Sequence, residues 1–324
     1  MCTAVTYKTK DHYFGRNLDL ECSYHETVTV TPRNYPFHFR KVNSLLNHYA
    51  MIGMAYVVGD YPLYYDATNE KGVSMAGLYF PGNAVYKPEV QGLDNVATFE
   101  LIPWILGQCG DINEVRTLLE HINIWNENFS AELPASPLHW MISDREKSIV
   151  VEAVRDGLKI YDNPVGVLTN NPPFDFQMLY LDNFMNVTAG EAVNRFSKKI
   201  DLKACSKGVG GMGLPGDLSS SSRFVKAAFT RLNSVSRDSE SESISQFFHI
   251  LGSVDQQRGC VRLGNDLYEM TVYSSCCNTD KGIYYYTTYE NSQITAVDMQ
   301  KEDLDGGRLV SYPLIQGQQI RIQN

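Results

Sequence analysis

The stretch MCTAVTYKTKDHYFGRNLD (1–19) decides the fold that the rest of the chain must fit. Its second residue is cysteine, and a small residue at this position normally lets the cellular aminopeptidase remove Met1. The mature chain would then begin with Cys2, which carries a thiol and a free α-amine. An unperturbed thiol has a pKa near 8.5, whereas an α-amine titrates at about 7.7–8.0. Because a neutral α-amine can take the thiol proton, the sequence predicts a self-contained nucleophile and base.

Two charged residues of this stretch favour the same interpretation. Segments 2–8 and 12–18 are expected to form adjacent antiparallel strands. That hairpin returns Arg16 and Asp19 close to Cys2. A cation favours the thiolate form of a cysteine, and an aspartate can anchor the amine. Charges after a hairpin are more often simply exposed, and this alternative stays open at the level of these residues.

Composition excludes several classes of protein. The 324 residues are 43% hydrophobic and 20% charged, which is typical of a globular protein with a large core. The net charge is -9 and the basic residues form no run, so we expect no nucleic-acid partner and no membrane insertion. Residues 1–30 do not resemble a signal peptide, and the most apolar window (99–109) is too short to span a bilayer. A cytoplasmic location is therefore expected.

The cysteines and histidines give no metal signature. Seven cysteines without a CxxC pair predict free thiols in a reducing cytosol, most of them buried, including the adjacent pair Cys276 and Cys277. The seven histidines lack ligand spacing, so no metal is expected. A conventional hydrolase with a Cys/His pair has no local support but stays open.

A glycine-rich segment does not predict a cofactor. KGVGGMGLPGD (207–217) contains a formal GxGxxG, but no buried strand precedes it, and Pro215 stands where a helix should run. We expect a loop near the functional site and no dinucleotide cofactor.

Periodicity predicts one α+β domain over 1–324, with Met1 removed. Strand patterns alternate with period two, and helix patterns carry apolar residues at three- and four-residue spacing. Asp111 and Ser219–Ser222 are expected N-caps. The expected strands are 3–7, 25–32, 148–154, 269–273, 282–290 and 293–298, with a hairpin over 138–154, and the expected helices are 97–108, 112–122, 222–234 and 243–254.

Two later segments add polar candidates. VGVLTNNPPF (165–174) ends a strand in an Asn-Pro turn, where Asn170 can donate to a developing oxyanion, although a plain turn is the commoner meaning. LPGDLSSSSRF (214–224) places Arg223 at a helix start, where the helix dipole does not favour a cation. That placement indicates a role at a site.

Taken together, these segments resemble the choloylglycine hydrolase family, the bile salt hydrolases and penicillin V acylases among N-terminal nucleophile hydrolases. The similarity runs nearly end to end, in the family's order. It rests on MCTA, FGRNLD, YPLYYDATNEKG, MAGL, SPLHW, NPVGVLTNNP, GLPGDLSSSSRF, SQFFHIL, YSSCC and KGIYYYTTYENSQITAVDM. The resemblance implies a four-layer αββα sandwich of two antiparallel sheets, no cofactor, and a homotetramer.

The resemblance also implies a role for each site residue. Cys2 would be the nucleophile and its own amine the base, and Asp19 would hold that amine. Arg16 and Arg223 would flank the thiolate. The oxyanion would be bound by the Asn170 side-chain amide and the backbone N–H of Tyr79.

Tyr79 is the main departure from the bile salt hydrolases, which usually carry asparagine at this position. In having tyrosine there, the chain resembles the penicillin V acylases. A backbone donor survives this substitution, whereas substrate preference is affected. Because the remaining motifs are closer to bile salt hydrolases, the hypothesis is an amidase that cleaves glycine- or taurine-conjugated bile acids. The alternatives are a penicillin V acylase using the same site and a non-catalytic protein that binds bile acids on this fold.

Overall fold

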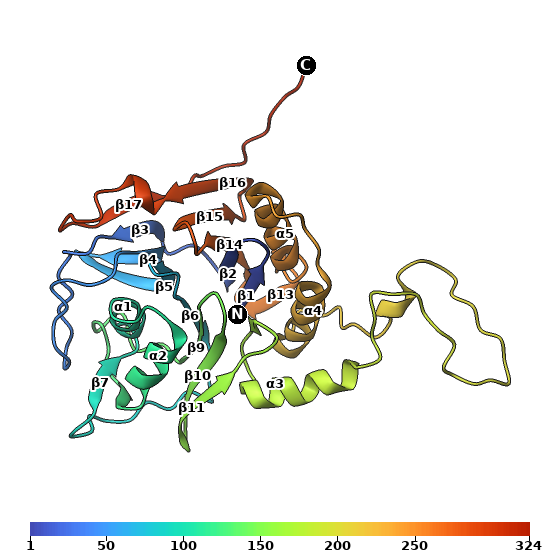
Figure 1. Ribbon diagram of the computed structural model, residues 1–324, viewed down its shortest axis with the longest axis horizontal. Coiled ribbons are helices and arrows are strands. Elements are labelled where there is room, and N and C mark those ends of the chain that lie inside the picture. Colours follow the sequence, from blue (N-terminus) through green and yellow to red (C-terminus); the bar gives the residue numbers. More distant parts are fainter.

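Two antiparallel sheets lie face to face and are covered on their outer sides by helices, which gives four layers (Figure 1). The computed structural model describes residues 1–324. This arrangement confirms the predicted αββα sandwich. None of the helices is long and apolar enough to cross a membrane.

The first sheet contains the N-terminus. Its hairpin is the predicted one, with β1 (Cys2–Lys8) antiparallel to β2 (His12–Leu20) and Cys2 opposite Leu18. Both strands are buried along almost their whole length, and β2 carries Arg16, Asn17 and Asp19 within this buried stretch. The strand order is β12 (Val167–Leu168), β1, β2, β14 (Leu267–Asn278), β15 (Ile283–Thr288) and β16 (Asn291–Asp298), with β13 (Val261–Gly264) paired to β14.

The second sheet has eight strands and includes the predicted hairpin of residues 138–154, formed by β9 and β10. Its order is β11 (Gly157–Asp162), β10 (Ser148–Val154), β9 (Leu138–Ser143), β6 (Ser74–Tyr79), β5 (Tyr61–Asn69), β4 (Met51–Val58), β3 (Thr27–Thr31) and β17 (Val310–Pro313).

Helices cover the outer faces of both sheets. A cluster of 38 buried residues fills the space between the sheets and beneath α4 (Ser220–Asn233) and α5 (Glu240–Gly252). A second cluster of 25 residues lies between the eight-stranded sheet and the helices α1 (Leu101–Leu106) and α2 (Ile112–Leu119). The remaining helix, α3 (Phe174–Leu181), follows the Asn-Pro turn and contacts α4.

Some predicted boundaries were wrong. The helix expected over 97–108 begins only at Leu101, because residues 94–97 form β7 (Asp94–Ala97), which pairs with β8 (Ile122–Trp125). Asp111 caps α2 as predicted, accepting from two backbone N–H groups. Ser219 occupies the N-cap position of α4 but makes no capping bond. The Asp217 carboxylate instead accepts from Ser219 N and Ser222 Oγ.

A long excursion, which we call the arm (residues 185–217), leaves the body between α3 and α4 (Figure 1). Apart from one short 3-10 turn (Val209–Gly211) it has no regular structure. The glycine-rich segment 207–217 belongs to this arm and does not line the cavity that contains Cys2. Its C-terminal end still lies close to the cavity, because Asp217 accepts from Ser222 and Ser220 lines the cavity.

The close approach of β2 and β14 generates a stability prediction. A Cβ atom on Gly15 would lie 1.9 Å from the backbone oxygen of Ser275. Since backbone of a paired strand cannot move aside, Gly15→Ala should lower the free energy of unfolding by more than about 2 kcal/mol. Gly216→Ala, where a Cβ atom meets open space, should change it by less than about 0.5 kcal/mol. Urea denaturation followed by fluorescence measures both, and equal midpoints would contradict the strand contact.

Candidate active site

Cys2 begins β1 and lines a cavity of about 730 Å³. The side chain is only 3% exposed, because β1 is an inner strand of the first sheet. Most of the cavity wall is apolar or aromatic and comes from both sheets and the loops around them. These residues include Leu18, Leu20, Tyr56, Leu63, Tyr65, Phe99, Ile102, Phe129, Leu133 and Leu263. The wall therefore suits a large apolar ligand whose polar end reaches Cys2.

Arg16 extends from the first sheet to the second. Its Nη1 donates to the carbonyl oxygens of Tyr65 on β5 (3.0 Å) and Gly77 on β6 (2.6 Å). Its Nη2 has no hydrogen-bond partner although the side chain is fully buried, and Arg16 lines the cavity beside Cys2. A buried cation beside a cysteine favours the thiolate in general, and the role expected of Arg16 stays a prediction.

Asn170 and Arg223 come together at the N-terminus, although 53 residues separate them in the chain. Asn170 Oδ1 accepts from Cys2 N and from Arg223 Nη2, both at 2.8 Å. Arg223 Nη1 donates to Cys2 O (2.6 Å) and to Thr3 Oγ1 (2.5 Å). The start of α4 thus holds the first residues of β1 in place, and Arg223 is buried in doing so.

Asp19 lies at the N-terminus, but its contacts differ from those expected. The Met1 ammonium donates to the Asp19 backbone oxygen at 2.7 Å and forms an ion pair with Glu269. The Asp19 carboxylate accepts from Thr271 Oγ1 (2.7 Å) and Gln256 Nε2 (3.3 Å). With Met1 attached, Cys2 N is an amide with one hydrogen, which Asn170 accepts. The amine contact predicted for the Asp19 carboxylate thus concerns the chain without Met1.

Tyr79 presents its backbone N–H at the edge of the cavity. Phe80 N donates to Pro137 O, and Leu138 N donates to Tyr86 Oη. Tyr79, opposite Leu138, therefore occupies a non-hydrogen-bonded position, and its N–H faces away from β9. On that side the pairing of β6 with β5 has already ended at Ala76. The N–H is therefore outside the ladder, as a donor to substrate must be.

The same geometry positions the second donor. Asn170 Nδ2 donates to the Tyr79 carbonyl at 2.7 Å. An amide nitrogen carries two hydrogens, so one remains for a ligand. Asn170 and Tyr79 thus form a connected pair at one wall of the cavity.

A buried histidine that sequence reasoning did not single out supports Asn170. His139 is fully buried, and its Nε2 lies 2.8 Å from Thr169 O, directly before Asn170 in the chain. Its Nδ1 lies 2.9 Å from Glu152 Oε1, and the ring stacks on Phe80 at 4.1 Å. The only sequence signal was its place in SPLHW. None of the histidines lines the Cys2 cavity, which argues against a catalytic Cys/His pair there.

The other cysteines divide into two groups. Cys109, Cys276 and Cys277 are buried, as predicted. Cys22, Cys205 and Cys260 are exposed, so with Cys2 four of the seven cysteines are buried and the prediction that most are buried is confirmed. The three exposed cysteines lie on loops, where apolar periodicity gives no information about burial.

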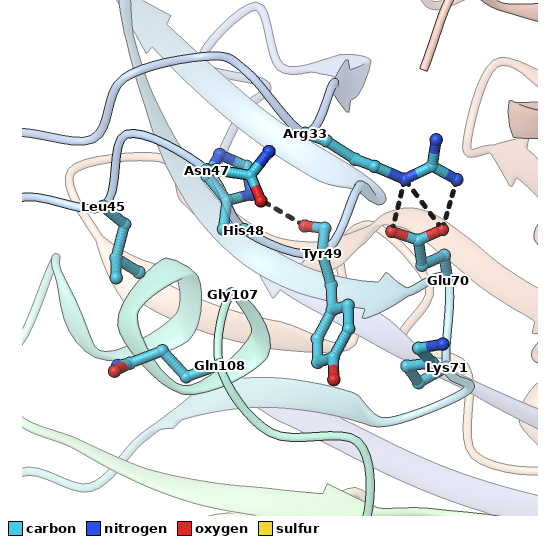
Figure 2. Close-up of a pocket in the computed structure, with 9 residues that line it drawn as sticks. All are labelled: Arg33, Leu45, Asn47, His48, Tyr49, Glu70, Lys71, Gly107 and Gln108. Atoms are coloured by element: carbon cyan, nitrogen blue, oxygen red, sulfur yellow. Dashed lines mark hydrogen bonds and ion pairs between the residues drawn. The ribbon is translucent and has the colours of Figure 1, made fainter. Parts of the chain in front are cut away.

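A second hollow, of about 560 Å³, lies near Arg33 and Glu70 on the surface (Figure 2). The charge of Arg33 is already neutralised, because its guanidinium donates to both oxygens of Glu70 and to Asp305. Lys71 lies over the Tyr49 ring. The hollow holds no cysteine and no unpaired buried group, so the chemistry concentrates at Cys2.

The buried carboxyl group of Asp255, close to Asp19, predicts that the free energy of unfolding depends on pH. Burial, and secondly the charge of Asp19, raises the pKa of Asp255 to about 6, from 3.8, while a hydrogen bond from Asn17 acts oppositely. Its contribution to stability is therefore fully present below pH 3.8 and lost as the pH rises through about 6. Asp255→Asn, which can still accept from Asn17, should flatten this part of the pH profile of unfolding. It should stabilise the protein by about 1–3 kcal/mol at pH 7. Urea unfolding at pH 4 and pH 7 tests this, and an equal effect at both would contradict it.

Known proteins are similar to this chain over nearly its whole length. The model of the choloylglycine hydrolase family, linear amide C–N hydrolases, matches residues 2–312. A bile salt hydrolase/transferase of Lactiplantibacillus plantarum is 57% identical over 314 residues, 97% of each chain, and one of Clostridium perfringens is 40% identical over 96% of each.

Solved structures agree. The C2A mutant of conjugated bile acid hydrolase from Clostridium perfringens superposes with a TM-score of 0.92 at 38% identity, covering 100% of both chains. Penicillin V acylase from Agrobacterium tumefaciens, at 20% identity and a TM-score of 0.75 over 96% of this chain and 90% of its own, shares the fold. Since the similarity extends through the whole sandwich, we conclude that the chain belongs to the choloylglycine hydrolase family and is a linear amide C–N hydrolase.

Proposed function

We propose that this enzyme is a bile salt hydrolase that cleaves glycine- or taurine-conjugated bile acids. The observation that carries the proposal is the position of Cys2, which lines a large apolar cavity beside Arg16 and Asn170. A steroid nucleus is rigid and apolar, and its amide side chain would extend toward Cys2. The relatives from Lactiplantibacillus plantarum and Clostridium perfringens bear the name bile salt hydrolase/transferase.

The proposed chemistry begins after Met1 is removed. The neutral α-amine of Cys2 takes the thiol proton, and the thiolate attacks the amide carbon. Negative charge develops on the carbonyl oxygen, where the Tyr79 N–H and the second hydrogen of Asn170 Nδ2 donate to it. The α-ammonium then protonates the departing nitrogen of glycine or taurine, which breaks the C–N bond and leaves a thioester on Cys2.

Deacylation returns the enzyme to its starting state. Water attacks the thioester carbon and gives a proton to the α-amine, and the Cys2 sulfur leaves as thiolate. An amine that attacks in place of water would form a new amide, and the relative's name includes the word transferase. Arg16 and Arg223 act in both halves because they stabilise the negative sulfur.

Penicillin V hydrolysis at the same site is the second candidate, favoured by one observation. Tyr79 is 46% exposed and lines the cavity, so its ring is available to stack on a phenoxy group.

A homotetramer in the cytoplasm completes the proposal, and the arm supports the assembly. Its apolar side chains lie in solvent in the single chain, as do neighbours on α3. They are Phe176, Leu179, Met185, Val193, Phe196 and Met212, exposed by 59% to 83%. An exposed apolar surface of this kind on a projecting segment is stabilised when a second copy covers it.

Comparison of substrates on protein shown by intact mass to lack Met1 tests the function. We expect kcat/KM for glycocholate and taurocholate to exceed that for penicillin V by orders of magnitude. Cys2→Ala should lower turnover at least about 10³-fold, because nucleophile and thioester are both lost. Cys22→Ala, which removes an exposed thiol, should stay within twofold.

Two other outcomes would each support one of the alternative functions. Faster cleavage of penicillin V would establish the second candidate instead. If the unsubstituted protein and Cys2→Ala both bind bile acids tightly and neither turns them over, the chain is a non-catalytic binding protein.

The assembly has a separate test. Size-exclusion chromatography with light scattering should give four times the chain mass of 36.6 kDa. The double variant F196E/M212E should give a smaller species, because two charges would have to be buried without partners. Val235→Glu, at an equally exposed apolar position outside the arm, is the control and should leave the mass unchanged. A tetramer that survives the double variant would contradict the role of the arm.

A further inference from the structure

Glu269 is a buried carboxylate at the N-terminus to which the mechanism above gives no role. It is 6% exposed, lines the Cys2 cavity, and lies on β14. Its neighbour two positions along, Thr271, faces the same side of the strand and donates to the Asp19 carboxylate. The side-chain partner of Glu269 is the Met1 ammonium. Processing removes this partner and leaves a buried charge beside the new N-terminus.

The position of Cys2 N limits how far Glu269 lies from it. Three bonds separate successive backbone nitrogens, so the two nitrogens lie roughly 3 Å apart. Because the Met1 ammonium contacts Glu269 directly, the carboxylate is within about 6 Å of Cys2 N. At this distance a hydrogen bond forms after a small rotation of the free N-terminus, and a charge interaction exists without any movement.

A count of hydrogen-bond donors gives a second reason. As an amide, Cys2 N carries one hydrogen, which Asn170 Oδ1 accepts. As an α-ammonium it carries three, so two more acceptors are needed in a buried place. The Asp19 carbonyl and the Glu269 carboxylate are the two acceptors that the Met1 ammonium uses here.

We propose that Glu269 is a positioning residue of the processed enzyme: its carboxylate orients the Cys2 α-amine and raises the basicity of that amine. This inference rests on the proposed function, in which the amine is the base. Burial lowers the pKa of an α-ammonium at this place, and Arg223 and Arg16 act in the same direction. A base with too low a pKa accepts the thiol proton poorly, so a carboxylate that offsets these effects is useful.

The charged and titratable groups around the amine come from four elements. They are the Cys2 thiol on β1, Arg16 and Asp19 on β2, Arg223 on α4 and Glu269 on β14. The two arginines disfavour the ammonium, whereas the thiolate, Asp19 and Glu269 favour it. Removal of the Glu269 charge therefore has one predicted sign.

The test is the pH dependence of kcat/KM for glycocholate with protein lacking Met1. The acid limb reports protonation of the free base. Glu269→Gln should move this limb to lower pH by about half a unit to one unit, with turnover reduced about 3- to 10-fold. Glu269→Asp, which keeps the charge, should return the limb toward its original position.

Glu21→Gln is the matched control. Glu21 lines the same cavity and carries the same charge, but it accepts a hydrogen bond from Tyr24 on the exposed side. It should leave the acid limb in place. Lower turnover of folded Glu269→Gln with an unmoved limb, or an equal shift in Glu21→Gln, would overturn the proposal.

One further measurement separates this inference from the proposed function. Mass spectrometry of acid-quenched wild-type reactions should detect a bile-acid thioester on Cys2. If no thioester forms and Cys2→Ala retains activity, the proposed function fails. If the thioester is detected and Cys2→Ala is inactive, Cys2 is the nucleophile. If the acid limb of Glu269→Gln then stays in place, only the role of Glu269 fails.

Discussion

The Arg16 guanidinium, buried between the two sheets, is the interaction on which the rest of the structure depends. It leaves β2 and meets carbonyl oxygens of β5 and β6, which ties the sheets together at the cavity. A buried cation is tolerable only where charges and acceptors surround it. Asp66 lies near this cation. Burial, the largest effect, leaves the pKa of its carboxyl raised, although Arg16 and the hydroxyl groups of Tyr273, Tyr284 and Ser275 act in the opposite direction. One side chain therefore fixes the spacing of the sheets and supplies positive charge next to Cys2.

The catalytic role that we propose for Cys2 is compatible with its place in the fold, because Cys2 belongs to a strand and is not a loose end of the chain. Cys2 is paired with Leu18 in the ladder and held by Asn170 and Arg223. Ordering a terminus has an entropic cost, and an inner β-strand offsets that cost with backbone hydrogen bonds and apolar burial. The residues that we propose as nucleophile, base and oxyanion donors are thus positioned by the fold before substrate arrives.

The sequence predicted best the contacts between residues that are close together in the chain. Arg16 and Asp19 return to Cys2 through a short hairpin, so alternation and a polar turn were sufficient. Asn170 and Arg223 were recognised locally as polar candidates, but their place beside Cys2 came from the resemblance, because no local rule brings together residues that far apart. Glu269 and the His139–Glu152 pair were missed for the same reason: alternation tells which strand positions face inward, but not which polar side chains meet there. The arm was not recognised because its apolar residues follow no period.

The two ends of the chain lie in opposite surroundings. The N-terminus lies at the Cys2 cavity in the middle of the molecule, while residues 319–324 are exposed and run away from the body (Figure 1). In the proposed mechanism, any peptide left in front of Cys2 would turn its amine into an amide and abolish the base. A purification tag, a fluorescent partner or a solid support must therefore be joined at Asn324, where the tail already provides a natural spacer.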